Sequence, residues 1–265
     1  MSLDLPPAGP GEVVTVHDLA WTYPDEARPV TAAVDELDRA AAVITVSEFS
    51  ADECVRHLGI SRPHVIPNGV DPRFYDAPPT SAEVLATHGI RIPFVLCAGG
   101  ATRRKNLAAL AAAWPRVRSQ HPGLTLVLTG PPDPRRTALF ADLDGTVLPG
   151  RLPNSLLPGL VAAAGCLVVP SLYEGFGLPA LEAMAAGTPV VASRASSLPE
   201  VVGDGGWLVT PDADGLADGI GQVMAGGPEV EAATARGRAR ASRFTWERSA
   251  AAHAKIWTEV AESRH

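Results

Sequence analysis

Cysteine, net positive charge and long apolar runs are all scarce in this chain of 265 residues. The cysteines, Cys54, Cys97 and Cys166, are odd in number and lie in or near apolar segments without metal-ligand spacing, so we expect buried, reduced thiols. The formal net charge of −7 argues against nucleic acid as a partner, because phosphate backbones are held mainly by basic surfaces. Reduced thiols suit a cytoplasmic protein.

Features of a membrane span and of a signal peptide are also missing. The longest apolar run, residues 160–169, is too short to cross a bilayer, and the first twelve residues lack the basic start and apolar block of a secretory leader. We therefore expect a cytoplasmic protein, with peripheral contact at the inner membrane face left open. An apolar share of 46% supports an ordinary packed core.

Short apolar runs of strand length alternate with helical segments along most of the chain. This alternation predicts an α/β fold built on a doubly wound parallel sheet. A proline-bearing linker follows Asp71 and divides the chain into two expected units. Residues 1–85 would form a small N-terminal subdomain, and residues 86–265 a Rossmann-like domain whose C-terminal helix packs back on the N-terminal part.

Two S-x-x-E patterns predict helix starts. Ser50 and Glu53 form one such capping box, and Ser197 and Glu200 form another. In this motif the two side chains satisfy free backbone amides in the first turn of the helix. A basic run near the C-terminus is interpreted as a solvated helix face, because spacings of two scatter its charges around the helix. Its members are Arg236, Arg238, Arg240 and Arg243.

The stretch from Cys166 to Ser193 carries the clearest functional signal. It reads as an apolar strand, a glycine-rich turn, a short helix and a second apolar strand. Free amides at Gly177 and Leu178, together with the helix dipole, favour an anion at this turn. Glu174 and Glu182 flank the turn with seven residues between them, so they are placed to hold hydroxyls on either side of a bound phosphate.

Two further strands end in residues that we expect at the same edge of the sheet as this turn. The cations Arg103 to Lys105 follow a strand that ends at Gly99 and Gly100, where positive charge opposes the dipole of the next helix unless an anion is bound. Solvated surface cations and a phosphate site remain equal alternatives. His17 follows the first strand at the edge where α/β folds bind ligands, although a lone histidine is more often structural.

Taken in order, these segments resemble the retaining family-4 glycosyltransferases of GT-B fold. The resemblance runs from about Val13 to Trp257, and EGFGLPALE is similar to the E-x7-E signature of that family. It rests on VVTVHDL, VITVSEFS, VIPNGVDPRFY, RRKNLAALAAAW, VLPGRLPNSLLPGL, PSLYEGFGLPALEAMAAGTPVVAS and LPEVVGDGG. The resemblance implies transfer of a hexose from a GDP- or UDP-linked sugar donor, with retention of configuration and without a metal ion or other cofactor. The HDL and PDE segments favour mannosyltransferase-like relatives that use GDP-mannose.

The resemblance also assigns roles to single residues. Arg104 and Lys105 match the cations that neutralise the donor diphosphate as the sugar bond breaks. Glu174 matches the carboxylate that faces the donor sugar, and Glu182 matches the one that holds the ribose hydroxyls. His17 matches the histidine that reaches the donor from the opposite domain. The remaining implied donor-binding positions are Gly99, Gly100, Leu152 at the nucleobase, and the backbone amides of Gly175, Phe176, Gly177 and Leu178.

One departure concerns the start of the chain. Relatives begin with a whole Rossmann-like acceptor domain, whereas here the HD strand opens the chain, so roughly 100 residues of that domain would be absent on ordinary domain sizes. Residues 1–85 are thus expected to be a truncated acceptor-side subdomain with an exposed sheet edge, which predicts a partner chain or an oligomer. The acceptor, whether glycan, lipid or small molecule, is not identified.

Three alternatives stay open. The chain could be a catalytically incomplete nucleotide-sugar-binding half that needs a partner chain. The D-x-D-G-T segment resembles the nucleophile motif of haloacid dehalogenase-type phosphatases, with Asp142 as nucleophile and Asp144 as acid. Gly175-x-Gly177-x-x-Ala180 also satisfies a dinucleotide-binding pattern, which is weak when it stands alone.

Overall fold

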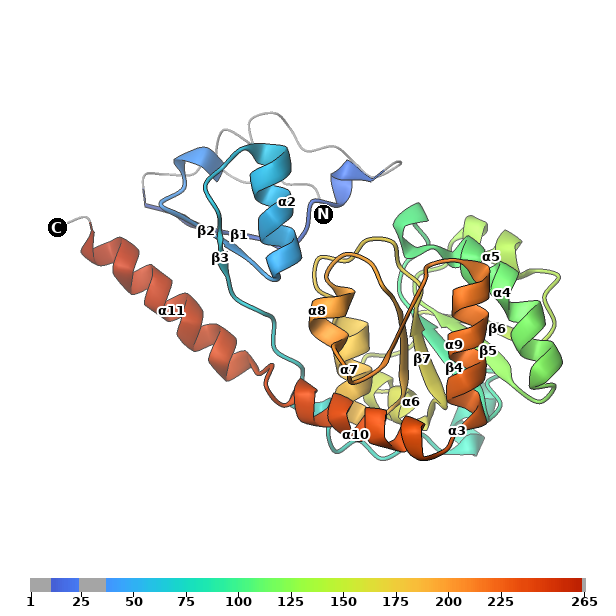
Figure 1. Cartoon of the computed structure of the whole chain (residues 1–265). Helices are drawn as coiled ribbons and strands as arrows, with labels where there is room; N and C mark the ends of the chain where they lie inside the picture. Colours follow the sequence, from blue (N-terminus) through green and yellow to red (C-terminus); the bar gives the residue numbers. More distant parts are fainter. Residues whose placement is uncertain (1–10, 24–36, 264–265) are drawn as a thin grey trace.

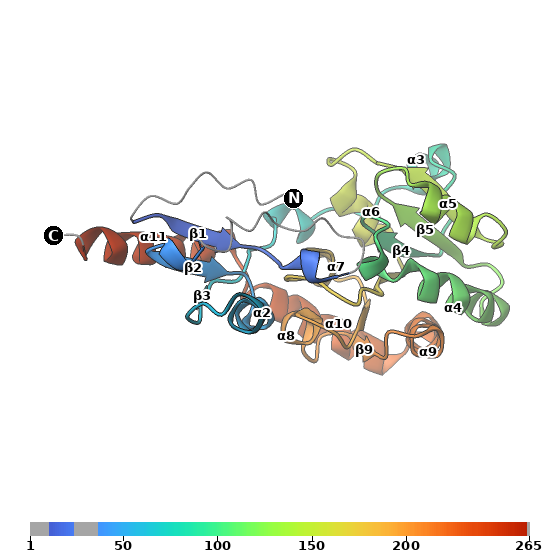
Figure 2. The same cartoon turned by 90° about the horizontal axis from the view of Figure 1, so that it is seen from above.

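The computed structural model describes residues 11–23 and 37–263. These residues form a smaller and a larger lobe, and α11 (Trp246–Glu262) runs from the larger lobe back along the smaller one (Figures 1 and 2). The PDE segment and the first ten residues lie outside the described residues, and so do the interpretations placed on them. Within the described part, no helix combines the length and the apolar character needed to cross a bilayer.

The smaller lobe is a three-stranded parallel sheet in the order β1-β2-β3. Its strands are β1 (Val13–Val16), β2 (Ala42–Thr45) and β3 (His64–Val65), and a 3-10 turn, η1 (Ala20–Thr22), follows β1. Alternate strand residues face opposite sides, as the two-residue period of a strand requires. Val14 and Val16 pack toward α2 (Glu48–Leu58), whereas Ala42 and Ile44 pack with Ile256 of α11.

Helix α2 begins at Glu48, so the prediction of a capping box at Ser50 and Glu53 is wrong. Ser47 is the N-cap, and its Oγ accepts the N–H of Ser50 at 3.0 Å. The carboxylate of Glu53 is instead paired with Arg56 within the helix. Ser47, three residues before Ser50, therefore occupies the N-cap position.

The larger lobe is a six-stranded parallel sheet in the order β6-β5-β4-β7-β8-β9, which confirms the predicted doubly wound α/β fold. Its strands are β4 (Phe94–Ala98), β5 (Thr125–Thr129), β6 (Thr146–Gly150), β7 (Cys166–Val169), β8 (Val190–Ser193) and β9 (Trp207–Val209). The strand order reverses between β4 and β7. Ligands of such folds bind at this reversal, at the carboxyl ends of the strands.

Helices cover both faces of this sheet (Figure 1). Apolar strand residues alternate between two clusters, one with α4 and α9 and the other with α6, α7 and α8. Their bounds are α4 (Leu107–Gln120), α9 (Ala213–Ala225), α6 (Leu157–Ala163), α7 (Leu178–Ala186) and α8 (Leu198–Val202). The remaining helices are η2 (Pro72–Phe74), α3 (Ala82–Thr87), η3 (Arg103–Lys105), α5 (Pro134–Phe140) and α10 (Pro228–Ala241).

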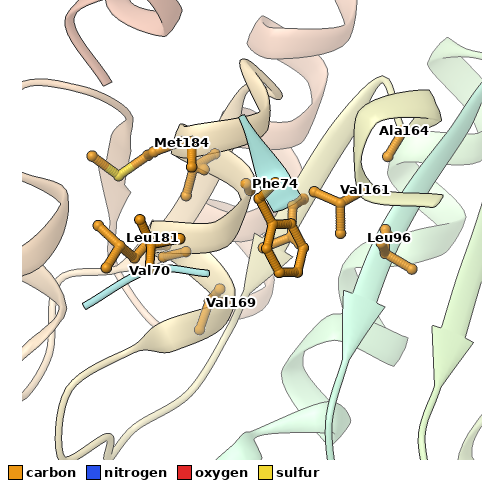
Figure 3. Packing of buried hydrophobic residues seen from close by; sticks show 14 of the residues in the cluster. Val70, Phe74, Leu96, Val161, Ala164, Val169, Leu181 and Met184 are labelled. Carbon is orange, nitrogen blue, oxygen red and sulfur yellow. The ribbon is translucent and has the colours of Figure 1, made fainter. Parts of the chain in front are cut away.

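The linker between the lobes contributes to the core of the larger lobe. Val70 and Phe74 are buried against α6 and α7, beside Val161, Leu181 and Met184 (Figure 3). Each buried side chain of this size contributes roughly 2 kcal/mol of hydrophobic stabilisation. The division of the chain at residue 85 stays a prediction. The three cysteines are buried and unpaired, as predicted, and burial raises the pKa of the Cys166 thiol to about 12.

The interpretation of the arginine run as a solvated face holds only in part: Arg236, Arg238 and Arg243 are exposed, whereas Arg240 is half-buried. Arg240 Nε and Nη2 donate to the carbonyls of Val201 and Glu200 at 2.8 and 2.6 Å. Arg236 Nε donates to the carbonyl of Asp204 at 3.1 Å. These bonds join α10 to the region around α8, because long side chains can pack along a surface while their heads find carbonyls.

The chain crosses between the lobes twice, and the two crossings touch. Val70 forms an isolated parallel bridge with Thr245, and its N–H donates to the carbonyl of Phe244 at 3.0 Å. At the neighbouring Gly69, a Cβ atom would lie 2.2 Å from the backbone nitrogen of Trp246. Only glycine permits this approach, so the linker and the start of α11 are held together at one point.

We expect Gly69→Ala to lower the free energy of unfolding by about 1–3 kcal/mol, because the added methyl group must push two backbones apart. Chemical denaturation measures this change. Gly123→Ala is the matched control, since a Cβ there meets nothing within 4 Å. Equal stability of the two variants would contradict the account of the crossing.

Candidate active site

The turns after β4 and β7 meet at the reversal of strand order in the larger lobe. The N–H of Leu172 donates to the carbonyl of Arg104 at 2.8 Å, which ties the two turns directly. Arg104 Nη1 also donates to the carbonyl of Tyr173 at 3.3 Å. The predicted cationic turn and the predicted glycine turn therefore form a single site.

A buried carboxylate lies among the predicted cations. Glu174 is 7% exposed, and its Oε1 accepts from Lys105 Nζ at 2.6 Å and from Ser171 Oγ at 2.7 Å. Its Oε2 lies 3.6 Å from Arg104 Nη1. The side chains of Arg104 and Lys105 are only 19% and 17% exposed, so the alternative of solvated surface cations is wrong for these two.

Asn106 shapes the cationic turn and was not singled out from the sequence. It adopts a left-handed backbone conformation with φ 53°, which asparagine tolerates better than most residues. Its Nδ2 donates to the carbonyls of Pro170 and Pro211 at 3.0 and 2.9 Å. Asn106 thereby fixes Lys105 against the strand ends on the opposite side of the site. The only available sequence signal was an asparagine immediately after the cations.

Arg136 is a second residue that sequence reasoning missed. Its side chain is buried, and Nη1 donates to the carbonyls of Gly99 and Thr129 at 3.0 and 3.1 Å. A Cβ on Gly130 would lie 2.0 Å from the Gly99 oxygen, so the two strand ends are in close contact. Arg136 holds this contact and adds positive charge beside the site. Gly100, the other predicted glycine of this turn, is exposed.

The predicted helix after the glycine turn is confirmed as α7. Gly177 is its N-cap with φ 107°, a conformation that favours glycine, and Leu178 is its first residue. Phe176 is buried, and its ring meets that of Phe244 edge-on at 5.8 Å. Leu152 is 5% exposed and packs in the same core, and its assignment to the nucleobase stays a prediction.

Glu182 differs from Glu174 in its surroundings. Burial, together with the smaller effect of the nearby Asp71 charge, raises the pKa of Glu182 to about 7. Glu174 has two cations beside it. The two carboxylates of the E-x7-E pattern thus lie in different surroundings: Glu174 is paired with Lys105 and Arg104, whereas the pKa of Glu182 is raised to about 7.

His17 comes to the site from the smaller lobe. It follows β1, its side chain is exposed, and its carbonyl oxygen would lie 2.1 Å from a Cβ placed on Gly175. Tyr173 reinforces this contact, because its hydroxyl accepts the N–H of Leu19 at 3.0 Å. The lobes therefore touch at the turn that carries Glu174.

The structure argues against the phosphatase alternative. The apolar segment before Asp142 and Asp144 is helix α5, and both aspartates precede β6, at the edge of the parallel sheet opposite the glycine turns. They line an open depression of about 500 Å³ with Trp114 and Arg118. Among the described residues, no group of three or more histidine, cysteine, aspartate or glutamate side chains is arranged to hold a metal ion.

The dinucleotide-binding alternative also finds no support in the side chains. Arg194 follows β8, where this alternative would place a cation for a phosphorylated ribose, but it is exposed and its Nη2 donates to the carbonyl of Leu208 at 3.0 Å. The glycine turn is contacted by the smaller lobe at Gly175, a contact that the dinucleotide pattern does not predict.

The raised pKa of Glu182 predicts a pH-dependent stability. Burial raises the pKa of this acid only in the folded state. The free energy of unfolding therefore falls as the pH rises from the pKa of the unfolded state, near 4.5, to about 7, because the folded state resists ionisation. We expect Glu182→Gln to be more stable than the parent above pH 7 by up to about 3 kcal/mol, and similar near pH 5. Urea denaturation from pH 5 to 8 measures this difference. A stability difference that does not vary with pH would refute this prediction, and so would the same difference in the control variant Glu229→Gln.

Comparison with known proteins gives the same family over most of the chain. Residues 92–226 match the family described as "Glycosyl transferases group 1", and residues 7–74 match "Glycosyltransferase Family 4". O-antigen chain mannosyltransferase B of Escherichia coli is 34% identical over 261 residues, covering 89% of this chain and 67% of the relative. The MMP alpha-(1->4)-mannosyltransferase of Mycolicibacterium hassiacum is 35% identical over 229 residues, covering 82% of this chain and 54% of the relative.

Solved structures agree on the fold. Sucrose-phosphate synthase from Thermosynechococcus elongatus superposes with a TM-score of 0.79 at 29% identity, covering 95% of this chain and 68% of that one. Anabaena HepE, solved with UDP and glucose, has a TM-score of 0.73 at 23% identity, covering 95% of this chain and 70% of that one. This chain spans between 54% and 67% of the length of the two mannosyltransferases.

Proposed function

Because this chain belongs to the retaining family-4 glycosyltransferases, we propose that it transfers a hexose from a nucleotide-diphosphate sugar to an acceptor with retention of configuration. The observation that carries the proposal is the cluster of Glu174, Lys105 and Arg104 beside the N-terminus of α7. The cluster supplies cations and free amides for a diphosphate, and a buried carboxylate for sugar hydroxyls.

The proposed division of labour follows from the surroundings of each group. Arg104 and Lys105 bind the diphosphate and neutralise the charge that develops as the bond between the sugar and the phosphate breaks. The amides of Gly177 and Leu178 bind the same group at the positive end of the α7 dipole. Glu174 accepts hydrogen bonds from the sugar, and Glu182 accepts them from the ribose.

The acceptor hydroxyl enters on the face that the diphosphate leaves. Its oxygen forms the new bond to the sugar carbon, and its proton passes to the departing phosphate oxygen, so no protein base is required. His17 approaches from the smaller lobe, at the contact between its carbonyl and Gly175. The acceptor itself, whether glycan, lipid or small molecule, stays open.

GDP-mannose is the first donor to test, because two relatives at 34% and 35% identity are mannosyltransferases. UDP-glucose is the second, because the fold is shared with a protein solved with UDP-glucose. Calorimetry with GDP and UDP, together with assays of donor hydrolysis and transfer, tests the proposal. Failure to bind either nucleotide would refute it.

A second candidate function is donor binding by a half-protein that requires a partner chain for transfer. One observation favours it: β1 is an edge strand of the described small sheet, and an edge strand can pair with another chain. Nucleotide binding without hydrolysis or transfer would support this candidate over the enzyme.

Substitution of the two carboxylates should separate their roles. We expect Glu182→Ala to weaken nucleoside diphosphate binding by about tenfold, since hydrogen bonds to the ribose are lost. Glu174→Gln should leave that binding nearly unchanged and lower sugar transfer by about tenfold or more, because the charged acceptor facing the sugar is removed. Calorimetry and a transfer assay measure the two effects. Equal losses in both variants would contradict the assignment.

Removal of Lys105 should weaken binding of the diphosphate far more than binding of the nucleoside. We expect Lys105→Ala to weaken binding of GDP or UDP by about tenfold or more, and binding of the free nucleoside by less than about twofold. The ratio of the two dissociation constants is the measured quantity. Lys255→Ala, on the exposed surface of α11, is the control. Parallel weakening of nucleoside and nucleotide would show that Lys105 has only a structural role.

A further inference from the structure

Side chains from both lobes hold the backbone of the turn that carries Glu174. From the larger lobe, the Glu174 N–H donates to Ser196 Oγ at 2.9 Å. Ser197 Oγ lies 2.8 Å from the carbonyl oxygens of both Glu174 and Phe176, which share its single hydroxyl hydrogen. Ser197 is fully buried, so these bonds are shielded from water. The predicted capping box at Ser197 and Glu200 is therefore wrong, since Ser197 binds this turn instead of capping α8.

From the smaller lobe, two hydroxyls meet the carbonyl of Gly175. Ser47 Oγ donates to this oxygen at 2.6 Å, and Ser50 Oγ donates at 3.1 Å. Both serines are buried, and both belong to the first turn of α2 or its N-cap. The Gly175 carbonyl thus depends on the smaller lobe for its hydrogen bonds, because a buried carbonyl without donors costs free energy.

Glu200 adds hydrogen bonds between the two lobes. It lies on α8, and its Oε2 and Oε1 accept the N–H groups of Glu48 and Phe49, each at 3.0 Å. The first amides of a helix have no partner within the helix, and the helix dipole favours a carboxylate beside them. The carbonyl of Glu200 accepts from Arg240 at 2.6 Å, which fixes the residue to α10.

We propose that Glu200 is a positioning residue, which couples closure of the smaller lobe to the geometry of the turn that carries Glu174. We call this network the interlobe clamp; it comprises Ser47, Ser50, Ser196, Ser197 and Glu200. The inference rests on the proposed transfer reaction, because the turn matters only if Glu174 faces a donor sugar. Separation of the lobes removes two acceptors from the amides of α2 and two donors from Gly175.

The clamp acts on transfer more than on nucleotide binding. The groups assigned to the ribose and the diphosphate, including Glu182 and Lys105, lie in the larger lobe and are held there without the smaller one. Gly175 is one point at which the lobes touch, since a Cβ there would meet the His17 carbonyl oxygen at 2.1 Å and Asp18 at 2.7 Å. Loosening of the clamp therefore loosens the backbone of the turn that carries Glu174 and separates His17 from Gly175.

Hydrogen–deuterium exchange on the full chain without ligand tests the coupling. In Glu200→Ala we expect exchange to rise by about tenfold in residues 46–52, which lose a cap, and also in residues 173–177 of the other lobe. Ser47→Ala should raise exchange in residues 173–177 as well, because it removes the stronger donor to Gly175. Two controls accompany this comparison. Exchange in β2 of Glu200→Ala should match that of the parent, which shows that the smaller lobe remains folded. Exchange throughout Glu229→Gln should also match that of the parent.

Kinetics separate a positioning role from a merely structural one. We expect Glu200→Ala to lower the turnover number for donor hydrolysis or transfer by about tenfold or more, while the dissociation constant for GDP or UDP changes by less than about twofold. Glu200→Gln keeps one acceptor oxygen for the α2 amides, so its turnover should lie between that of the parent and that of Glu200→Ala.

Two results would overturn the proposal. One is faster exchange in Glu200→Ala confined to residues 46–52, and the other is equal weakening of turnover and nucleotide affinity. Failure of the parent chain to bind either nucleotide would instead count against the proposed function. The exchange comparison needs no ligand, so it still decides whether Glu200 couples the two lobes.

Discussion

The buried ion pair between Glu174 and Lys105 is the interaction on which the rest of the site depends. It joins the turn after β7 to the turn after β4, and its 2.6 Å contact lies where the strand order reverses. A buried carboxylate is costly unless it is paired and hydrogen-bonded, and Glu174 meets both conditions through Lys105 and Ser171. The same pairing leaves Arg104 and Lys105 concentrated at the N-terminus of α7, where a diphosphate is favoured.

The two signature carboxylates lie in different surroundings. Glu174 is paired with cations, whereas burial and Asp71 raise the pKa of Glu182 to about 7. In the proposed reaction the first group faces the sugar and the second binds the ribose. Their separation along the chain arises from the seven intervening residues, but their different environments arise from neighbours far away in the sequence.

The lobes are connected in two places that have different physical characters. At Gly69 and Val70 the two chain crossings pack backbone against backbone, which makes a compact joint. At Gly175 the contact is polar and passes through Ser47, Ser50 and Glu200, so it can be broken and remade at modest cost in water. A joint on one side and a polar contact on the other is the arrangement expected of lobes that close over a ligand.

The sequence by itself determined the doubly wound fold, helix α7 and the glycine turn before it, because apolar periodicity and the positions of proline and glycine act locally. The tertiary structure alone decided which hydrogen-bond partners the polar side chains have. The S-x-x-E pattern of Ser197 and Glu200 is compatible with a local cap, yet Ser197 binds the Glu174 turn and Glu200 binds the amides of α2. Likewise the arginines of α10 and the roles of Asn106 and Arg136 depend on carbonyls brought close by folding. A short motif specifies which hydrogen bonds a side chain is able to make, and only the packed chain specifies which of them it makes.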